Sequence, residues 1–95
     1  MREFDFCVGD ILDAIPSILR CGGNIRINNT MLKLGYLIYR FTPKSESWHT
    51  YSYYIFKKEE TGKYRFIGSE PFLERCKHAI WSDIEKVFAF KFPSL

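Results

Sequence analysis

Arg26 is the side chain of this sequence that is best placed to bind an anion. It lies in a run, residues 24–28, in which polar and apolar side chains alternate, so Asn24 and Asn28 share its face of a predicted strand. A guanidinium flanked by amides offers several hydrogen-bond donors to a phosphate or a carboxylate. The alternative is an exposed strand arginine that binds no ligand.

Aromatic side chains that could stack on a nucleobase gather in the middle of the chain. Trp48 and His49 lie in a predicted loop, Tyr53 lies in the predicted strand after it, and Tyr39 lies in the predicted strand before it. Stacking on such a ring contributes about 1–3 kcal/mol per base. The alternative is a sheet face buried against a second subunit. The two interpretations are compatible, because ligand pockets often form where subunits meet.

Asp83 is a candidate acceptor of hydrogen bonds from a base or a ribose. It follows Trp81 by two residues, near the predicted end of a helix. Residues 82–85 also have the spacing of a helix cap, which is the alternative role for Asp83, with Trp81 as a core residue. The predicted ligand-binding residues are therefore Asn24, Arg26, Asn28, Tyr39, Trp48, His49, Tyr53 and Asp83.

The sequence offers little for catalysis or metal binding. Cys76 and His78 are two positions apart in a predicted helix, so their side chains do not face each other. The three cysteines form no Cys-x-x-Cys pair, and nucleophile-elbow, zinc-protease, P-loop and dinucleotide-binding motifs are absent. We therefore expect no enzymatic activity, no metal and no cofactor, with Cys76 as a small core residue.

Length and charge narrow the class of protein further. The chain has 95 residues, which suits a single domain over residues 1–95. Its net charge of +3, from 14 basic and 11 acidic residues, is low for a nucleic-acid binder. No run approaches the roughly 20 apolar residues of a membrane helix, and the start does not resemble a signal peptide. We expect a cytoplasmic protein with no membrane partner, located in the host cytoplasm if the chain is viral.

Hydrophobic periodicity predicts the order helix, strands, helix, strand. Residues 6–20 place their apolar side chains on one helical face, and Gly22 and Gly23 would end that helix. A helix of two to three turns is expected after Pro71, and residues 86–92 alternate like a final strand. The other strands are expected at residues 24–28, 34–41, 50–58 and 63–67, with a hairpin turn at 59–62.

This order predicts an α+β fold. We expect an antiparallel sheet of about five strands, with the N-terminal amphipathic helix on one face and a short helix before the last strand. Aromatic residues make up 18% of the chain, and the predicted strands are apolar on both faces. A domain of this size hides only about 60–65% of its chain surface when it folds alone. We therefore expect a second copy to cover the remaining face, in a dimer or a tetramer.

Four segments resemble parts of a known family. Residues 11–15 are similar to its amphipathic N-terminal helix, and residues 22–27 to its Gly-rich cap and basic strand. Residues 37–39 are similar to its next strand, and residues 82–88 to its closing element. The family is the phage-encoded second Thoeris anti-defence family. The resemblance implies a non-enzymatic homo-oligomer that sequesters nucleotide-derived immune signals, such as cyclic ADP-ribose isomers or cyclic oligonucleotides.

In such a protein, Arg26 and Asn28 would bind phosphates, and Tyr39 or Trp48 would stack on bases. Asp83 would accept hydrogen bonds from ribose hydroxyls. Two other functions stay open. A small viral inhibitor of a host protein, of the anti-CRISPR type, would use Trp48 and the tyrosines as contact residues. A single-stranded nucleic-acid binder would use aromatic strands and scattered lysines, although the near balance of charges disfavours this function.

Overall fold

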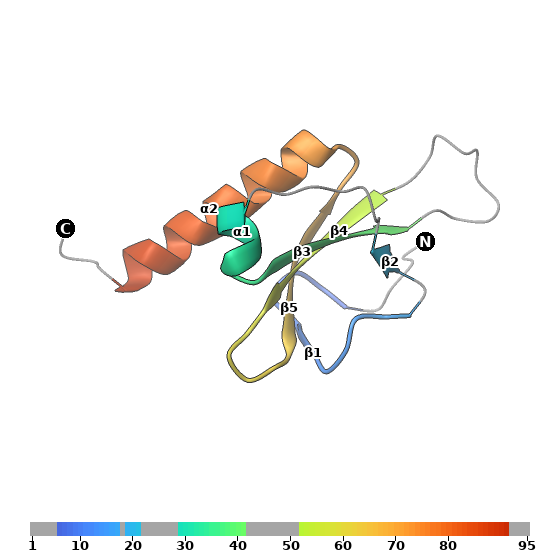
Figure 1. Ribbon diagram of the computed structural model, residues 1–95, viewed down its shortest axis with the longest axis horizontal. Helices are drawn as coiled ribbons and strands as arrows, with labels where there is room; N and C mark the ends of the chain where they lie inside the picture. Colours follow the sequence, from blue (N-terminus) through green and yellow to red (C-terminus); the bar gives the residue numbers. More distant parts are fainter. Residues whose placement is uncertain (1–5, 18, 22–28, 42–51, 92–95) are drawn as a thin grey trace.

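The computed structural model describes residues 6–17, 19–21, 29–41 and 52–91, with backbone alone at 20, 21, 29 and 88–91. It confirms the predicted α+β class and the antiparallel sheet. The predicted strand at 24–28 lies outside the described residues. In chain order (Figure 1) the elements are β1 (Ile11–Leu12), β2 (Arg20–Cys21), α1 (Asn29–Lys33), β3 (Tyr36–Phe41), β4 (Ser52–Lys58), β5 (Tyr64–Glu70) and α2 (Leu73–Lys91).

Strands β3, β4 and β5 form the centre of the sheet. The strand order is β1-β5-β4-β3-β2, and both edge strands are two residues long. Aromatic and β-branched side chains, which favour strands, dominate the middle of β4. The turn after β4 is closed by hydrogen bonds from the Glu59 amide to the Lys63 carbonyl (2.8 Å) and from the Gly62 amide to the Glu59 carbonyl (2.9 Å). The predicted hairpin is therefore confirmed.

Helix α2 packs on one face of the sheet (Figure 1). Cys76, Ile80 and Ile84 recur every four residues on its inner side, and all three are buried, which confirms the core position predicted for Cys76. No helix in the described ranges, α2 included, is long and apolar enough to cross a membrane. The core on this face consists of Met31, Tyr36, Ile38, Ile55, Cys76, Ile80 and Ile84.

The strand predicted at 86–92 is wrong, because α2 continues to Lys91. Alternating phenylalanines suggested a strand, but Val87 also continues the helical spacing of Ile80 and Ile84. No glycine or proline stands between Leu73 and Lys91 to end the helix. The helical pattern therefore persists well beyond the two to three turns that we expected.

The second face of the sheet is covered by the N-terminal residues of the chain itself. Phe6, Leu12, Ile15 and Leu19 pack with Phe41, Phe56 and Phe66 in a second apolar cluster. The ring centroids of Phe6 and Phe66 are 4.7 Å apart in an edge-to-face arrangement. The face without the N-terminal segment, which we expected a second subunit to cover, is the face on which α2 packs, and the second subunit itself stays a prediction.

The helix predicted at 6–20 is wrong: within the described part of that range, the backbone turns and then forms β1. Gly9 has a φ of +95°, which a right-handed helix does not accommodate. The Gly9 amide donates to the Phe66 carbonyl and the Phe66 amide donates to the Asp10 carbonyl, both at 2.9 Å. Because β5 satisfies these backbone groups, the apolar side chains reach the sheet without a helix.

Candidate functional site

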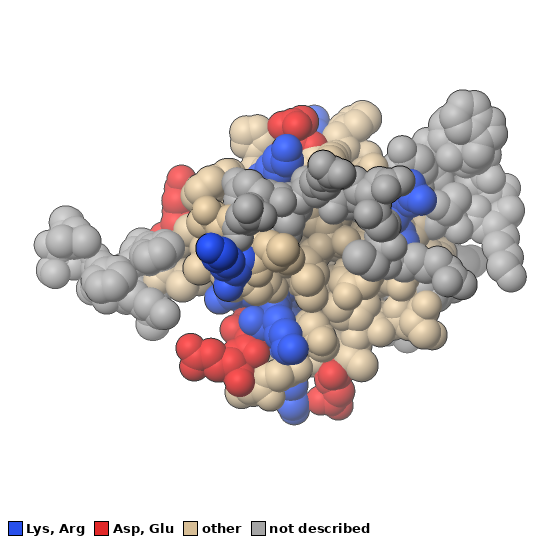
Figure 2. All heavy atoms as spheres, viewed as in Figure 1, with Lys and Arg blue, Asp and Glu red and all other residues tan. Residues whose placement is uncertain are grey.

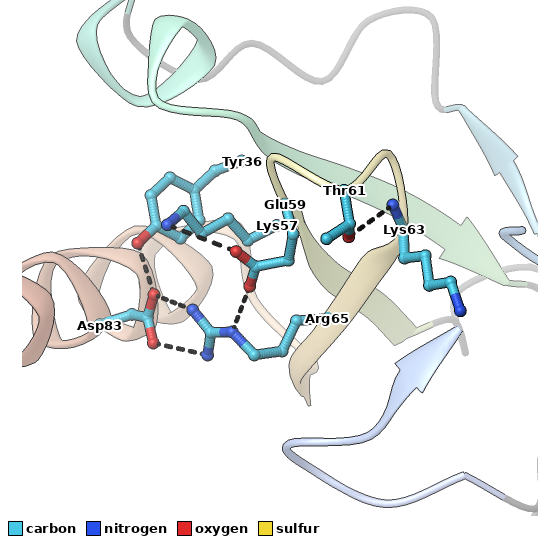
Figure 3. A network of polar contacts seen from close by, with 7 residues as sticks. All are labelled: Tyr36, Lys57, Glu59, Thr61, Lys63, Arg65 and Asp83. Carbon is cyan, nitrogen blue, oxygen red and sulfur yellow. Dashed lines mark hydrogen bonds and ion pairs between the residues drawn. The ribbon is translucent and has the colours of Figure 1, made fainter. Parts of the chain in front are cut away.

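Three polar side chains lie side by side across the sheet on the face that α2 covers (Figure 3). Tyr36 of β3 is registered with Lys57 of β4, and Lys57 is registered with Arg65 of β5. The Lys57 Nζ atom lies 5.8 Å from the centroid of the Tyr36 ring. The alternation of side chains along each strand therefore places two cations and a phenol in one row.

Asp83 reaches this row from α2. Arg65 Nη1 donates to Asp83 Oδ1 at 3.0 Å, and Arg65 Nη2 donates to Asp83 Oδ2 at 2.9 Å. The Tyr36 hydroxyl donates to the same Oδ2 atom at 2.5 Å. Asp83 therefore links α2 to both β3 and β5 through a bidentate ion pair and a hydrogen bond.

Glu59, just after β4, completes the network (Figure 3). Its Oε1 atom accepts a hydrogen bond from Arg65 Nε at 2.7 Å, and its Oε2 atom lies 4.0 Å from Lys57 Nζ. All three guanidinium nitrogens of Arg65 therefore donate to carboxylates. Two carboxylates balance two cations, so the network carries no net charge of its own.

Tyr36 and Arg65 keep their protons at neutral pH, and Asp83 stays ionised, because the pKa of each group is shifted away from 7. Burial, followed by the hydrogen bond to Asp83, raises the pKa of Tyr36 above its usual value. Burial alone would raise the pKa of Asp83, but hydrogen bonds from Arg65 and Tyr36 outweigh it and lower that pKa. Hydrogen bonding to Asp83 raises the pKa of Arg65, against the opposing effect of burial. These three groups are therefore poised for holding α2, and not for acid–base exchange near pH 7.

An open cleft of about 940 Å³ lies beside the network, between α1, the β4–β5 hairpin, β1 and α2. Basic and acidic side chains gather around this hairpin (Figure 2). The Lys63 Nζ atom is 3.3 Å from Asp13 Oδ1, whereas Lys33 and Lys58 have no ion pair within the described ranges. The charged residues that line the cleft are Lys33, Lys57, Lys58, Glu59, Glu60, Lys63 and Arg65.

Apolar side chains share the cleft with these charges. Ile11 and Leu34 line it with 51% and 39% of their surfaces exposed, and Val87 lines it from α2. A second hollow of about 330 Å³ lies between the turn at Gly9 and α2, and Arg65 borders both spaces. The larger cleft thus combines ammonium groups that have no ion pair with any described residue and exposed apolar surface, a lining that suits an anion with an apolar body.

The described residues of the predicted ligand set do not come together. Tyr39 packs on the second face, its ring centroid 5.9 Å from that of Phe56, whereas Tyr53 packs against the core under α2. Asp83 lies in the network and lines the smaller hollow, whereas it does not line the larger cleft. Trp81 is 45% exposed, so its predicted core position is wrong. Five predicted residues lie outside the described residues, namely Asn24, Arg26, Asn28, Trp48 and His49.

Sequence reasoning missed the cleft and most of the network. Lys57 precedes the predicted 59–62 turn by a few residues, and Arg65 follows it by a few residues. Strand alternation within the predicted hairpin could therefore have placed the two opposite each other. The contributions of Lys33 and Val87 had no such signal, since α1 was not predicted and α2 was expected to end earlier. Within the described residues, no group of three His, Cys, Asp or Glu side chains could hold a metal ion.

Comparisons with models of protein families, with curated proteins and with solved structures find no match to this chain. The family resemblance noted in the sequence therefore stays a prediction.

Proposed function

We propose that this protein is a non-enzymatic binding protein that sequesters a nucleotide-derived small molecule in the cleft beside β4 and β5. One observation carries the proposal: Lys33 and Lys58 lie without an ion-pair partner among the described residues, in the same cleft as exposed Ile11 and Leu34. Ammonium groups attract phosphate, and apolar side chains attract a base or a sugar face. A nucleotide has both parts.

The size and charge of the cleft support a small ligand over a long polyanion. Its volume of about 940 Å³ is comparable to known small-molecule sites. Glu59 and Glu60 stand among the lysines and would repel an extended phosphate backbone. A ligand with one compact anionic group avoids that repulsion, and its hydroxyl or amino groups can donate to the exposed Glu60 carboxylate.

Sequestration without turnover is the mode that the neighbouring network supports. Its tyrosine, arginine and aspartate keep their neutral-pH protonation states, so none of them is suited to exchange protons with a bound substrate at pH 7. The resemblance to the second Thoeris anti-defence family supplies the narrower form of the proposal. In that form, the ligand is an immune signal such as a cyclic ADP-ribose isomer or a cyclic oligonucleotide, and the protein is a homo-oligomer.

The test is calorimetric titration with cyclic ADP-ribose, ADP-ribose, cyclic dinucleotides and a single-stranded oligonucleotide, followed by heat release and chromatography of the ligand. We expect binding of at least one small nucleotide and its recovery intact. The variants Lys33→Gln and Lys58→Gln should each weaken binding by about fivefold. Arg75→Gln is the matched control, because Arg75 is exposed on α2, carries the same charge and lines neither hollow.

Three outcomes would count against the proposal. Chemical conversion of the recovered ligand would make the protein an enzyme. Equal losses in the cleft variants and in Arg75→Gln would place the ligand elsewhere. Tight oligonucleotide binding that falls steeply with salt would favour the nucleic-acid alternative, because release of counterions makes such binding strongly salt-dependent.

Exposed aromatic residues favour a second candidate function, the inhibition of another protein through α2 and the residue that precedes it. Phe72 and Trp81 are 63% and 45% exposed, and large aromatic side chains are typical contact residues of protein interfaces. A photo-reactive residue placed at position 81 should then cross-link one reproducible partner in cells. A cleft that binds nucleotide while no cross-link forms would contradict this second function.

A further inference from the structure

The Asp83 carboxylate has little capacity left for a ligand. Both of its oxygens accept hydrogen bonds from Arg65, and Oδ2 also accepts one from the Tyr36 hydroxyl. Only 12% of the side chain is exposed. A ribose hydroxyl would have to donate to the one remaining acceptor position on Oδ1, or displace a charged, bidentate partner, which is a costly exchange.

The position of Asp83 in α2 connects it to the cleft in another way. Val87 stands four residues later, about one helical turn, and lines the cleft. Arg65, the partner of Asp83, also lines the cleft. The described residues contain no other ion pair between α2 and the sheet. The charged contact that fixes this part of α2 is therefore made next to the cleft wall.

We propose that Asp83 is a positioning residue of the cleft. It fixes α2 on the sheet so that Val87 forms the cleft wall, and it keeps the Arg65 guanidinium bound in the ion pair. The claim about ligand affinity rests on the proposed function, whereas the claim about α2 does not. Asp83 then acts on the ligand through α2 and Arg65, in place of the direct contact with ribose that the sequence suggested.

A role for Arg65 as a direct ligand contact predicts the opposite change in ligand affinity, so the direction of that change tests the proposal. If Arg65 contacted the ligand and Asp83 only neutralised it, removal of the Asp83 charge would free the guanidinium and strengthen binding of an anion. If Asp83 positions α2, its removal loosens the cleft wall and weakens binding, even though the protein gains net positive charge.

The first experiment needs no ligand. Amide hydrogen exchange of α2 should be at least tenfold faster over residues 80–87 in Asp83→Asn than in the unmodified protein, because the variant loses the charge of a bidentate pair. Glu85→Gln is the matched control, since Glu85 is exposed on the same helix and pairs with no described residue. Unchanged exchange in Asp83→Asn would overturn the proposal.

Where Asp83→Asn does not fold, Tyr36→Phe replaces it, because this variant keeps every charge and removes one hydrogen bond to the same carboxylate. It should accelerate exchange over residues 80–87 by a smaller factor, about threefold, and no change there would overturn the proposal.

The second experiment titrates ADP-ribose, a nucleotide with a compact pyrophosphate. Asp83→Asn should weaken its binding by about tenfold, with Glu85→Gln unchanged. Equal or tighter binding by Asp83→Asn would overturn the positioning role and favour Arg65 as a ligand residue. Where the unmodified protein binds another nucleotide of the panel and not ADP-ribose, that nucleotide replaces ADP-ribose in this titration. Failure to bind any nucleotide of the panel would count against the proposed function, while the exchange data would still decide whether Asp83 positions α2.

Discussion

The Tyr36 hydroxyl donates a hydrogen bond to the Asp83 carboxylate across 47 residues of sequence, and so joins the first residue of β3 to the middle of α2. The Tyr36 ring lies in the core under α2, with 1% of the residue exposed. Its apolar body and its polar tip thus have different roles. The ring fills the core, and the hydroxyl satisfies a charged group at the edge of that core.

Replacement of Tyr36 by phenylalanine should lower the free energy of unfolding by about 1–2 kcal/mol, because a hydrogen bond to a partly buried carboxylate is lost. The substitution removes only the hydroxyl group and keeps the ring that fills the core. Urea unfolding followed by circular dichroism measures this difference. Tyr64→Phe is the control, since Tyr64 is half-buried on the other face and makes no hydrogen bond from its hydroxyl within the described residues. Equal losses in the two variants would contradict a specific role for the Tyr36 hydroxyl.

The lowered pKa of Asp83 predicts a loss of stability in acid. Its folded pKa lies below the unfolded value of about 3.9, so its contribution is fully present above that value and is lost as the pH falls through the folded pKa. Asp83→Asn should therefore be less stable than the unmodified protein at pH 7, and the difference should shrink towards pH 2. Thermal melts between pH 2 and pH 7 measure it. A difference that does not depend on pH would show that the Asp83 charge is not responsible.

Helices and strands could be predicted from the sequence where the residues that determine them lie close together in the chain. The hairpin was predictable because its turn and both strands lie within 19 consecutive residues, 52–70. Cys76 was predictable as a core residue because its helix carries its own periodicity. The end of α2 was not predictable, because phenylalanines at alternate positions fit a strand and can equally occur in a helix.

The N-terminal segment illustrates a different limit. Its apolar residues have helical spacing, yet Leu12 and Ile15 pack on Phe56 and Phe66 from a segment that pairs with β5. Tertiary packing overrides the local pattern because the sheet offers both apolar contacts and backbone partners. The candidate site could not be predicted for the same reason. Asp83 contacts Arg65 only because α2 packs on the sheet, and the spacing of the two residues in the sequence does not indicate that contact.

Gly35 should be the glycine that tolerates substitution least among those described. It has a φ of +98°, and a Cβ atom there would lie 2.9 Å from the Lys58 carbonyl oxygen. Its own carbonyl accepts a hydrogen bond from the Lys58 amide at 2.8 Å, so the residue also sets the approach of α1 to the end of β4 beside the cleft.

Gly35→Ala should cost roughly 2 kcal/mol or more of unfolding free energy, from the left-handed backbone and the clash together. Gly9→Ala is the matched control, because Gly9 has a similar φ of +95° with no atom within 4 Å of the added Cβ, and it should cost about 1 kcal/mol. Chemical denaturation of both variants measures the difference. Equal costs would mean that the backbone at Gly35 shifts freely away from Lys58.

The two cysteines whose side chains are described should differ strongly in reactivity. Cys7 is exposed, whereas Cys76 is buried beneath α2, and burial raises the pKa of the Cys76 thiol to about 11. Because the thiolate is the reactive form, both access and ionisation protect Cys76 at neutral pH. Iodoacetamide at pH 7.5, followed by mass spectrometry of the separate peptides, should label Cys7 at least 100-fold faster than Cys76, and urea should abolish the difference. Comparable rates for the two peptides in the absence of urea would mean that α2 detaches readily from the sheet, and would argue against Asp83 as the residue that holds it there.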